Sequence, residues 1–590
     1  MSVTDLHDRE LSQAMWAAVP ALRARHGELY DRNPKAFFRL AGDAARVRDM
    51  RAVIAIGQVL SARDGLASAP ARKLSFASHY AASLSEHARF KEALAVLEDP
   101  RSADVGHHKY WRQLAHVLAG AGRLADARTA VEQSLRIRPD FRPAKELAAD
   151  LAAMGELKAR IPDGATWPDV RTLLDLYLKL GMRGPARKLL DRILCNPLKK
   201  PWRSPDDVLA ILDAAADLLD PAIVRLALDQ ISLGERRADE LEAMRVRYDV
   251  LLGRAAAVCA GASGAERGGR DLRRELAMAW AAQGRFDEAI DRLGRLSLEE
   301  RDDNRVRTDL AYCVGADVLA RAPLRLKPAS GRRIFNLVPF NDELAMLDVR
   351  LAEMAGWVDR IVIVEATRTF TGEPKPLHFQ NNIARYSEYG SKLLHVVVDD
   401  PPPYVQTPWA RDFHQRDMAI AALSGLAAPD DLVLLTDADE IVDRRAVERF
   451  DGEFACLMMN MYRFFLNYRP RPDHQPQRRT AAVWRAGGLA RFGSSYARFA
   501  LSRHKSAWPV IRDAGWHFTS VRNPADIVAK MNSYAHQERK PRWRDEAQVA
   551  EILARIRGGK AEKGWERCEI DESYPGYIRR NLSAFAELII

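Results

Sequence analysis

The stretch "VLLTDADEIV", Val433 to Val442, places three carboxylates directly after an apolar run. The run Leu432 to Leu435 predicts a strand that is covered on both faces, as in a parallel α/β sheet. Asp437 and Asp439 are two residues apart, so their side chains share one face of an extended segment. Such a carboxylate pair is a hard oxygen site for Mg²⁺ or Mn²⁺, which bind together with substrate phosphates. The open alternative is a solvated acidic turn or a helix N-cap.

Strand-like and helix-like segments alternate on both sides of this stretch. Strands are expected at 333–340, 358–366, 392–400 and 430–435, and helices at 342–356 and 410–426. This βαβ order predicts a Rossmann-like α/β domain with a mostly parallel sheet. Ligands of such sheets bind beyond the carboxyl ends of the strands, which is where Asp437 and Asp439 emerge.

The N-terminal half has a different pattern. From about residue 40 to 325, apolar residues recur at helical spacing in segments rich in Ala, Leu and Arg. The segment His107 to Asp140 matches the ~34-residue tetratricopeptide pattern, in which small Ala115 and Ala127 let two helices approach and Gly122 permits the turn. Related units recur at 80–97, 173–197 and 276–293. We therefore expect an all-α tetratricopeptide-like solenoid.

A segment rich in Pro, Gly and Ser, Arg321 to Arg333, interrupts the helical pattern before the first predicted strand. The expected domains are 1–325, the helical repeats, and 326–590, the α/β domain. A repeat array of this kind offers a concave surface for a protein partner. The alternative is that it packs against the second half as a spacer.

Composition limits the class of protein. The chain has 590 residues, of which 47% are hydrophobic, enough for a core in each of several domains. Its net charge of +10 is compatible with nucleic acid, an anionic membrane surface or a phosphate-bearing substrate. The basic residues are dispersed, and no basic helix or RNA-binding signature accompanies them, so we expect no nucleic-acid partner.

The N-terminal sequence and the cysteines indicate the cellular location of the protein and its redox chemistry. The N-terminus lacks the basic and apolar regions of a signal peptide, and no run reaches the ~18 apolar residues of a membrane span. We therefore expect a cytoplasmic protein without a transmembrane segment. The five cysteines are scattered without a CxxC pair, which argues against disulfides and zinc sites.

Residues 333 to about 585 resemble glycosyltransferase family 17. The resemblance rests on four blocks in order: "FNDELAMLDVRLAEM", "VDRIVIVEATRTFTGEPKPLHF", "PDDLVLLTDADEI", and "AGWHF" with the later "PRW". It implies a glycosyltransferase-A fold, a nucleotide-sugar donor such as UDP-GlcNAc, a divalent metal and inversion at the anomeric carbon. Asp437 and Asp439 match the family's DxD motif and would hold Mn²⁺ against the donor diphosphate, where the ion acts as a Lewis acid.

Further site residues follow from the resemblance. His517 lies in the "AGWHF" block and is expected as a third metal ligand or a phosphate contact, or else as a core histidine. Inversion requires a general base, for which Glu365, Glu343 and Asp513 are candidates, Glu365 being favoured. Each of these carboxylates has the alternative role of a helix cap or an ion-pair partner.

The donor's anionic groups need cationic contacts. Lys375, in the loop "FTGEPKPLHF", and Arg416, in the helix after the third strand, are the candidates, although most such side chains are only solvated surface. Aromatic residues of "MYRFFLNYRPRP" are expected either to stack on sugar faces or to pack in the core.

The leading hypothesis is a metal-dependent, inverting glycosyltransferase that moves a GlcNAc-like sugar from a UDP-linked donor to a glycan or protein hydroxyl, with repeats that dock the acceptor or a partner. Two alternatives stay open. One is a catalytically inactive tetratricopeptide scaffold, and the other is a different nucleotide-dependent α/β transferase, such as a nucleotidyltransferase. The absence of a signal peptide makes a cytosolic polysaccharide, lipid-linked sugar or protein the expected acceptor.

Overall fold

The structure, a computed structural model, divides into two compact units, Met1–Ala279 and Trp280–Ile590, which are described separately. The residues described are 19–32, 34, 37–38, 41, 50–62, 74–86, 89–98, 106–160, 167–194, 238–251, 253–261, 268–299, 304–328, 332–450, 452–474, 477–503, 509–535 and 541–590. The part of the predicted repeat array at 195–237 lies outside these residues.

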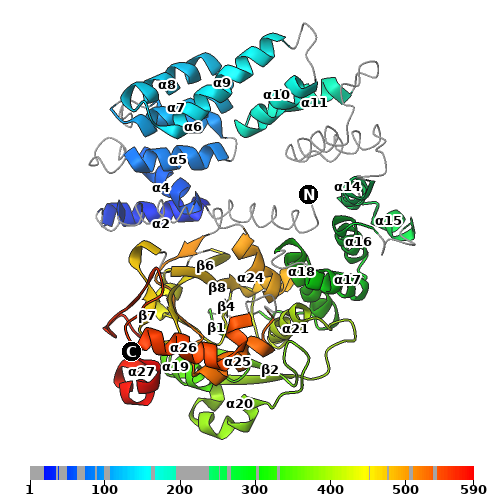
Figure 1. The fold of residues 1–590 in the computed structure, drawn as a ribbon, viewed down its shortest axis with the longest axis vertical. Helices are drawn as coiled ribbons and strands as arrows, with labels where there is room; N and C mark the ends of the chain where they lie inside the picture. The colour runs from blue at the N-terminus through cyan, green and yellow to red at the C-terminus, as the bar shows by residue number, and fades with distance from the viewer. Residues whose placement is uncertain are drawn as a thin grey trace. The chain divides into compact units, whose positions relative to one another are not determined.

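The first unit consists of antiparallel helical hairpins in its described part (Figure 1). In the clearest repeat, α7 (His108–Gly120) packs on α8 (Leu124–Ile137), with Ala115 and Ala127 buried between them and Gly122 in the turn at φ 82°. The prediction of tetratricopeptide-like helices is confirmed. The other helices in the described part of this unit are α2 (Val19–Arg32), α4 (Met50–Ala62), α5 (Leu74–Glu86), α6 (Phe90–Leu97), α9 (Arg142–Arg160), α10 (Trp167–Lys179), α11 (Arg183–Leu194), α14 (Ala238–Leu251), α15 (Ala255–Gly261) and α16 (Arg270–Ala282), whose last residues pass the division at Ala279.

The second unit begins with two further helices, α17 (Phe286–Glu299) and α18 (Asn304–Arg321), before the first strand. α18 packs against α17, α21 (Pro408–Ala421) and α24 (Ser494–Arg503), so it is buried on nearly every side. The packing is tight at Gly315 of α18. A Cβ added there would lie 3.1 Å from the Phe492 carbonyl oxygen and 3.3 Å from the Gly493 Cα. The division between the two compact units therefore lies at Ala279 and Trp280, earlier in the chain than residue 325. That the two predicted domains fold independently stays a prediction.

The second unit contains a mixed sheet in the order β3-β2-β1-β4-β8-β6-β10-β5, with β9 beside β6. α21 packs on β1 and β2, and α24 packs on β8. The strands are β1 (Ile334–Phe340), β2 (Arg360–Ala366), β3 (Leu393–Val398), β4 (Leu432–Leu435), β5 (Glu440–Val442), β6 (Phe454–Arg463), β8 (Gln477–Arg485), β9 (Val510–Ile511) and β10 (Gly515–Thr519).

The prediction of a mostly parallel sheet is correct for the first half of the domain. Strands β3, β2, β1 and β4 pair in parallel, as their βαβ order requires. The second half is mixed, because β8 lies antiparallel between β4 and β6, and β5 antiparallel to β10. Antiparallel neighbours need no crossover helix, so the βαβ order that identified the first half does not apply to β8.

The remaining elements of the second unit surround the sheet. They are α19 (Leu344–Met354), α20 (His378–Asn381), η5 (Ile383–Lys392), α22 (Arg444–Glu448), β7 (Tyr468–Pro470), η6 (Pro472–His474), α23 (Ala486–Phe492), α25 (Pro524–Ser533), η7 (Pro541–Arg544), α26 (Glu546–Arg557), β11 (Trp565–Arg567), α27 (Gly576–Arg580) and η8 (Leu582–Leu588). β7 and β11 form a separate two-stranded sheet. The four cysteines that the structure describes are free. Within the described ranges, every helix is too short or too polar to span a bilayer.

Candidate active site

The acidic stretch forms a tight turn between β4 and β5. The Asp437 amide donates to Glu440 Oε2 at 2.7 Å, and the Glu440 amide donates to the Asp437 carbonyl at 3.0 Å. The buried Arg350 of α19 donates to the carbonyl oxygens of Asp437 at 2.5 Å and Glu440 at 2.6 Å. The guanidinium group of Arg350 therefore holds the backbone of the turn, and this fixes the directions of the Asp437 and Asp439 side chains.

Asp437 is bound by two arginines. Its Oδ1 accepts from Arg416 Nη1 of α21 at 2.6 Å, and its Oδ2 accepts from Arg498 Nη2 of α24 at 2.6 Å. Burial acts to raise the pKa of Asp437, but these two guanidinium groups lower it to about 2. Both carboxylate oxygens thus have a cationic partner.

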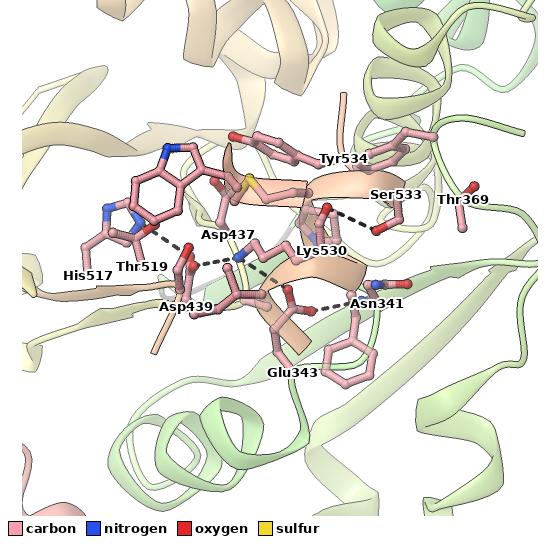
Figure 2. Close-up of a pocket in the computed structure, with 18 of the residues that line it drawn as sticks. Asn341, Glu343, Thr369, Asp437, Asp439, His517, Thr519, Lys530, Ser533 and Tyr534 are labelled. Atoms are coloured by element: carbon pink, nitrogen blue, oxygen red, sulfur yellow. Dashed lines mark hydrogen bonds and ion pairs between the residues drawn. The ribbon is translucent and has the colours of Figure 1, made fainter. Parts of the chain in front are cut away.

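Asp439 faces a different set of side chains. Its Oδ2 accepts from Lys530 Nζ of α25 at 3.0 Å, and its Oδ1 lies 3.4 Å from His517 Nε2 of β10 (Figure 2). Burial acts against the charged forms of both residues, but Lys530 and His517 hold the pKa of Asp439 well below its usual range. Asp439 in turn raises the pKa of His517. Lys530 also lies 3.7 Å from Glu343 Oε1, so it bridges two carboxylates.

Most of these residues line one pocket of about 410 Å³. Its lining includes Asp437, Asp439, His517, Lys375 and Arg416, five of the residues predicted from the sequence. Lys375 Nζ is buried there and has no hydrogen-bond partner in the described part of the chain. Burial lowers the pKa of Lys375, although nearby carboxylates oppose the shift. An ammonium group without a partner at a pocket wall is suited to an anionic ligand.

The three candidate bases are separated by the fold. Glu343 lines the pocket, with Oε1 2.8 Å from Arg522 Nη2. Glu365, the favoured candidate, is fully buried and accepts from the Phe379 amide at 2.8 Å, at the start of α20. Asp513 accepts from the Gln477 amide side chain. Neither Glu365 nor Asp513 is among the described residues that line the pocket.

The aromatic residues of 461–472 divide between core and pocket. Tyr462, Phe465 and Tyr468 are buried in hydrophobic clusters, as the core alternative predicted. Phe464 is also buried but lines the pocket, beside Trp543 of η7 at 5.4 Å between ring centroids.

The side-chain oxygen and nitrogen atoms at this site match the ligands of a divalent metal ion only in part. Within the described ranges, no three His, Cys, Asp or Glu side chains converge as ligands of one metal ion. Asp437 is engaged on both oxygens by arginines, and its place among the three predicted ligands stays a prediction. Asp439 Oδ1 and His517 Nε2, by contrast, face each other at 3.4 Å, longer than an ordinary hydrogen bond, at the pocket wall. Mg²⁺ and Mn²⁺ sites commonly use one or two protein ligands plus phosphate oxygens.

Four cationic residues of the site were not predicted: Arg350, Arg498, Arg522 and Lys530. Arg350 lies inside the quoted block "FNDELAMLDVRLAEM", where an arginine on the apolar face of an expected helix was a signal of a buried partner. The other three follow the acidic turn by many residues, and no local pattern distinguishes them from solvated basic residues.

The comparisons with known proteins agree with the position of this site. Residues 324–560 match the model of glycosyltransferase family 17, and residues 252–311 match a tetratricopeptide repeat model. The family 17 match lies in the C-terminal half, and it includes every described residue that lines the pocket except Trp565. The second match spans both sides of the division between Ala279 and Trp280.

The similar curated proteins carry one name. A β-1,4-mannosyl-glycoprotein 4-β-N-acetylglucosaminyltransferase of Rattus norvegicus is 34% identical over 149 residues, 23% of this chain and 27% of the relative. The Homo sapiens protein of the same name is also 34% identical over 149 residues, 23% of this chain and 28% of the relative. The chain therefore spans little more than a quarter of the length of these relatives.

Solved structures of tetratricopeptide repeat proteins are also among the matches. A tetratricopeptide repeat protein from Parabacteroides merdae is 12% identical, covers 50% of this chain and 98% of its own, and superposes with a TM-score of 0.19. A score this low adds nothing to the assignment of the fold or the site.

Proposed function

We propose that the second unit is a glycosyltransferase that moves a sugar, GlcNAc-like, from a UDP-linked donor to a hydroxyl group, with inversion at the anomeric carbon and with a glycosyltransferase-A type of active site. One observation carries the proposal: the pocket at the end of β4 combines the Asp437 and Asp439 turn with the unpartnered ammonium of Lys375. That combination suits a diphosphate, which needs cationic partners in a site that excludes water. The N-acetylglucosaminyltransferase relatives suggest the sugar.

Each residue has a role in this proposal. Lys375 and Lys530 bind the diphosphate oxygens and stabilise the charge that develops on the leaving group. Asp439 and His517, in place of their contact with each other, would hold a Mn²⁺ or Mg²⁺ ion, and that ion would supply Lewis-acid stabilisation of the same charge. Asp437 does not bind the ion; through Arg416 and Arg498 it keeps the turn and Asp439 in place.

The acceptor hydroxyl must lose a proton as the sugar transfers. Glu343 is the one of the three predicted bases that lines the pocket, and we assign it this role. Its ion pairs with Arg522 and Lys530 hold its carboxylate in place at the pocket wall. The helical repeats then serve to dock the acceptor or a partner protein.

Calorimetric titration of UDP tests the proposal. We expect binding in Mn²⁺ that weakens in EDTA, and a further loss of about tenfold to a hundredfold in Lys375→Met, since hydrogen bonds to charged groups contribute about 1.5–3 kcal/mol. Lys560→Met, at an exposed lysine, is the matched control and leaves UDP affinity unchanged.

The alternatives make different forecasts in the same titration. Absence of UDP binding by the intact protein would favour the scaffold hypothesis. Tighter binding of nucleoside triphosphates, with their hydrolysis, would favour a nucleotidyltransferase. Equal UDP affinity in Mn²⁺ and EDTA would remove the metal from the mechanism.

A further inference from the structure

The two edges of the large sheet in the second unit differ in exposure. β5 forms one edge, and all three of its residues are buried. β3 forms the other edge, and five of its six residues are partly or fully exposed, with Val397 at 40%. Among the strands that the structure describes, β3 pairs with β2 alone. β3 is therefore an open edge of this sheet.

The backbone of β3 offers hydrogen bonds at the open edge. The Val398 carbonyl accepts from the Thr367 amide, just after β2, at 3.1 Å, so the backbone polar groups of Val398 face β2. Because these groups alternate in direction along a strand, those of Val396 also face β2, and those of His395 and Val397 face away from the sheet. Unpaired N–H and C=O groups at a sheet edge are a template for a further strand.

β3 lacks the features that usually protect such an edge. Natural edge strands carry Lys or Pro, a bulge, or a charged side chain that points inward. The sequence of β3 is "LLHVVV", and its register with β2 is uninterrupted from Leu393 to Val398. His395, its one polar residue, lies 3.2 Å from the buried Glu365 and is only 16% exposed. The open edge is therefore apolar and regular along the whole strand.

We propose that β3 pairs with β3 of a second copy of this chain, antiparallel and across a two-fold axis at Val396. Lys392 directly precedes the strand, and Asp399 and Asp400 directly follow it. In the antiparallel pair, Lys392 of each copy lies opposite Asp400 of the other copy, and Asp399 lies next to it. A parallel pair would instead set Lys against Lys and Asp against Asp, which is destabilising. The charges at the two ends of β3 thus fit a second copy in one orientation.

The axis at Val396 also satisfies the backbone. It places His395 opposite Val397 of the second copy, and both direct their N–H and C=O groups at the open edge, so each such pair forms two hydrogen bonds. The same patch is used by both copies, so the assembly closes as a dimer and the open edge disappears. No residue of β3 is among the described residues that line the pocket, so this inference does not depend on the proposed function.

Sedimentation equilibrium of the full chain measures the dimer. We expect a species of about twice the 66.2 kDa of one chain. Val397→Lys places a charge on the open edge of both copies and should raise the dissociation constant of the dimer at least about tenfold. Val397→Thr keeps the branched shape and the backbone N–H, so it is the matched control and retains the dimer.

Cysteine cross-linking tests the register. Val396 meets its own copy in a pair that is not hydrogen-bonded, where the Cα atoms are about 4.5 Å apart. That distance allows a disulfide, so Val396→Cys should give a covalent dimer on mild oxidation. In Leu394→Cys the two new thiols are four residues apart along the strands, at least about 13 Å, and no cross-link is expected. The intact protein, oxidised in parallel, is the control for the native cysteines.

Charge reversal tests the orientation. Lys392→Glu should weaken the dimer, and Lys392→Glu combined with Asp400→Lys should restore it. Lys392 also donates to the Val358 carbonyl at 3.0 Å within its own copy, so the rescue, rather than the loss, reports the contact between copies. Melting temperatures show which variants keep their fold. If Val397→Lys lowers the melting temperature, the cross-link and the charge rescue decide.

Three results would overturn the proposal. The first is an intact protein that stays monomeric at its highest soluble concentration. The second is a dimer that survives folded Val397→Lys and forms no cross-link in Val396→Cys, because its interface then lies elsewhere. The third is a mass that keeps growing with concentration, because a two-fold contact between identical edges closes at two copies.

Discussion

Replacing Asp437 by Asn separates a metal ligand from a structural anchor. The substitution removes the negative charge between Arg416 and Arg498, whose side chains are only 15% and 16% exposed. Removing one partner of a buried ion pair costs about 3–5 kcal/mol. Asp437 itself is 31% exposed, and each arginine keeps a second carboxylate, Asp412 at 2.8 Å and Glu440 at 3.0 Å. We therefore expect a loss of about 2–3 kcal/mol in the free energy of unfolding.

For a domain of this size, that loss lowers the melting temperature by about 5 °C. Thermal unfolding followed by circular dichroism at neutral pH measures it. Asp430→Asn is the matched control, because Asp430 is 80% exposed in its pair with Arg485 and its loss should shift the melting temperature by less than about 1 °C. A melting temperature of Asp437→Asn as close to the intact protein as that of Asp430→Asn would refute the anchor role and return Asp437 to the list of metal ligands.

Three further predictions concern other parts of the second unit. Glu343→Gln should lower the transfer rate about a hundredfold or more with UDP affinity unchanged, whereas a loss of UDP affinity alone would place Glu343 in the donor site instead. Burial raises the pKa of Asp417 to about 6 despite hydrogen bonds from Ser494 and Ser495. The stability of the folded protein therefore falls as pH rises from about 4 through 6. Asp417→Asn should raise the melting temperature at pH 7.5, and should raise it less at pH 5. A chain shortened to 280–590 should unfold cooperatively, while 332–590, which lacks α17 and α18, should aggregate, and equal solubility of the two would contradict the packing of α18.

Local sequence patterns correctly predicted the parallel half of the sheet in the second unit. The parallel strands β1 to β4 and the turn with Asp437 and Asp439 follow from apolar runs and βαβ order. The antiparallel strand β8 was missed, because its pairing with β4 and β6 depends on segments distant in the chain. Hydrophobic periodicity shows which face of an element is buried, but not which element covers it.

The site shows the same limit at the level of single residues. Asp437 meets Arg498, 61 residues later, and Asp439 meets Lys530, 91 residues later. Neither cation stands out in its own helix. Glu365 was favoured as a base because it ends a strand, yet that position also lets it accept hydrogen bonds from the amides of Phe379 and Gln380. A strand end marks the region of a site, and only tertiary contacts decide which side chain enters it.

The packing of α18 has a consequence for the order in which the protein is made. α18 leaves the ribosome before any strand of the sheet, but α24, against which it packs, is synthesised only after β8. Until α24 is made, the face of α18 that packs against α24 in the folded protein stays exposed. Contacts between distant segments form slowly, and apolar surface that waits for them favours aggregation. The helical hairpins of the first unit, whose contacts are between neighbours, can complete their folding while the second unit is still being translated.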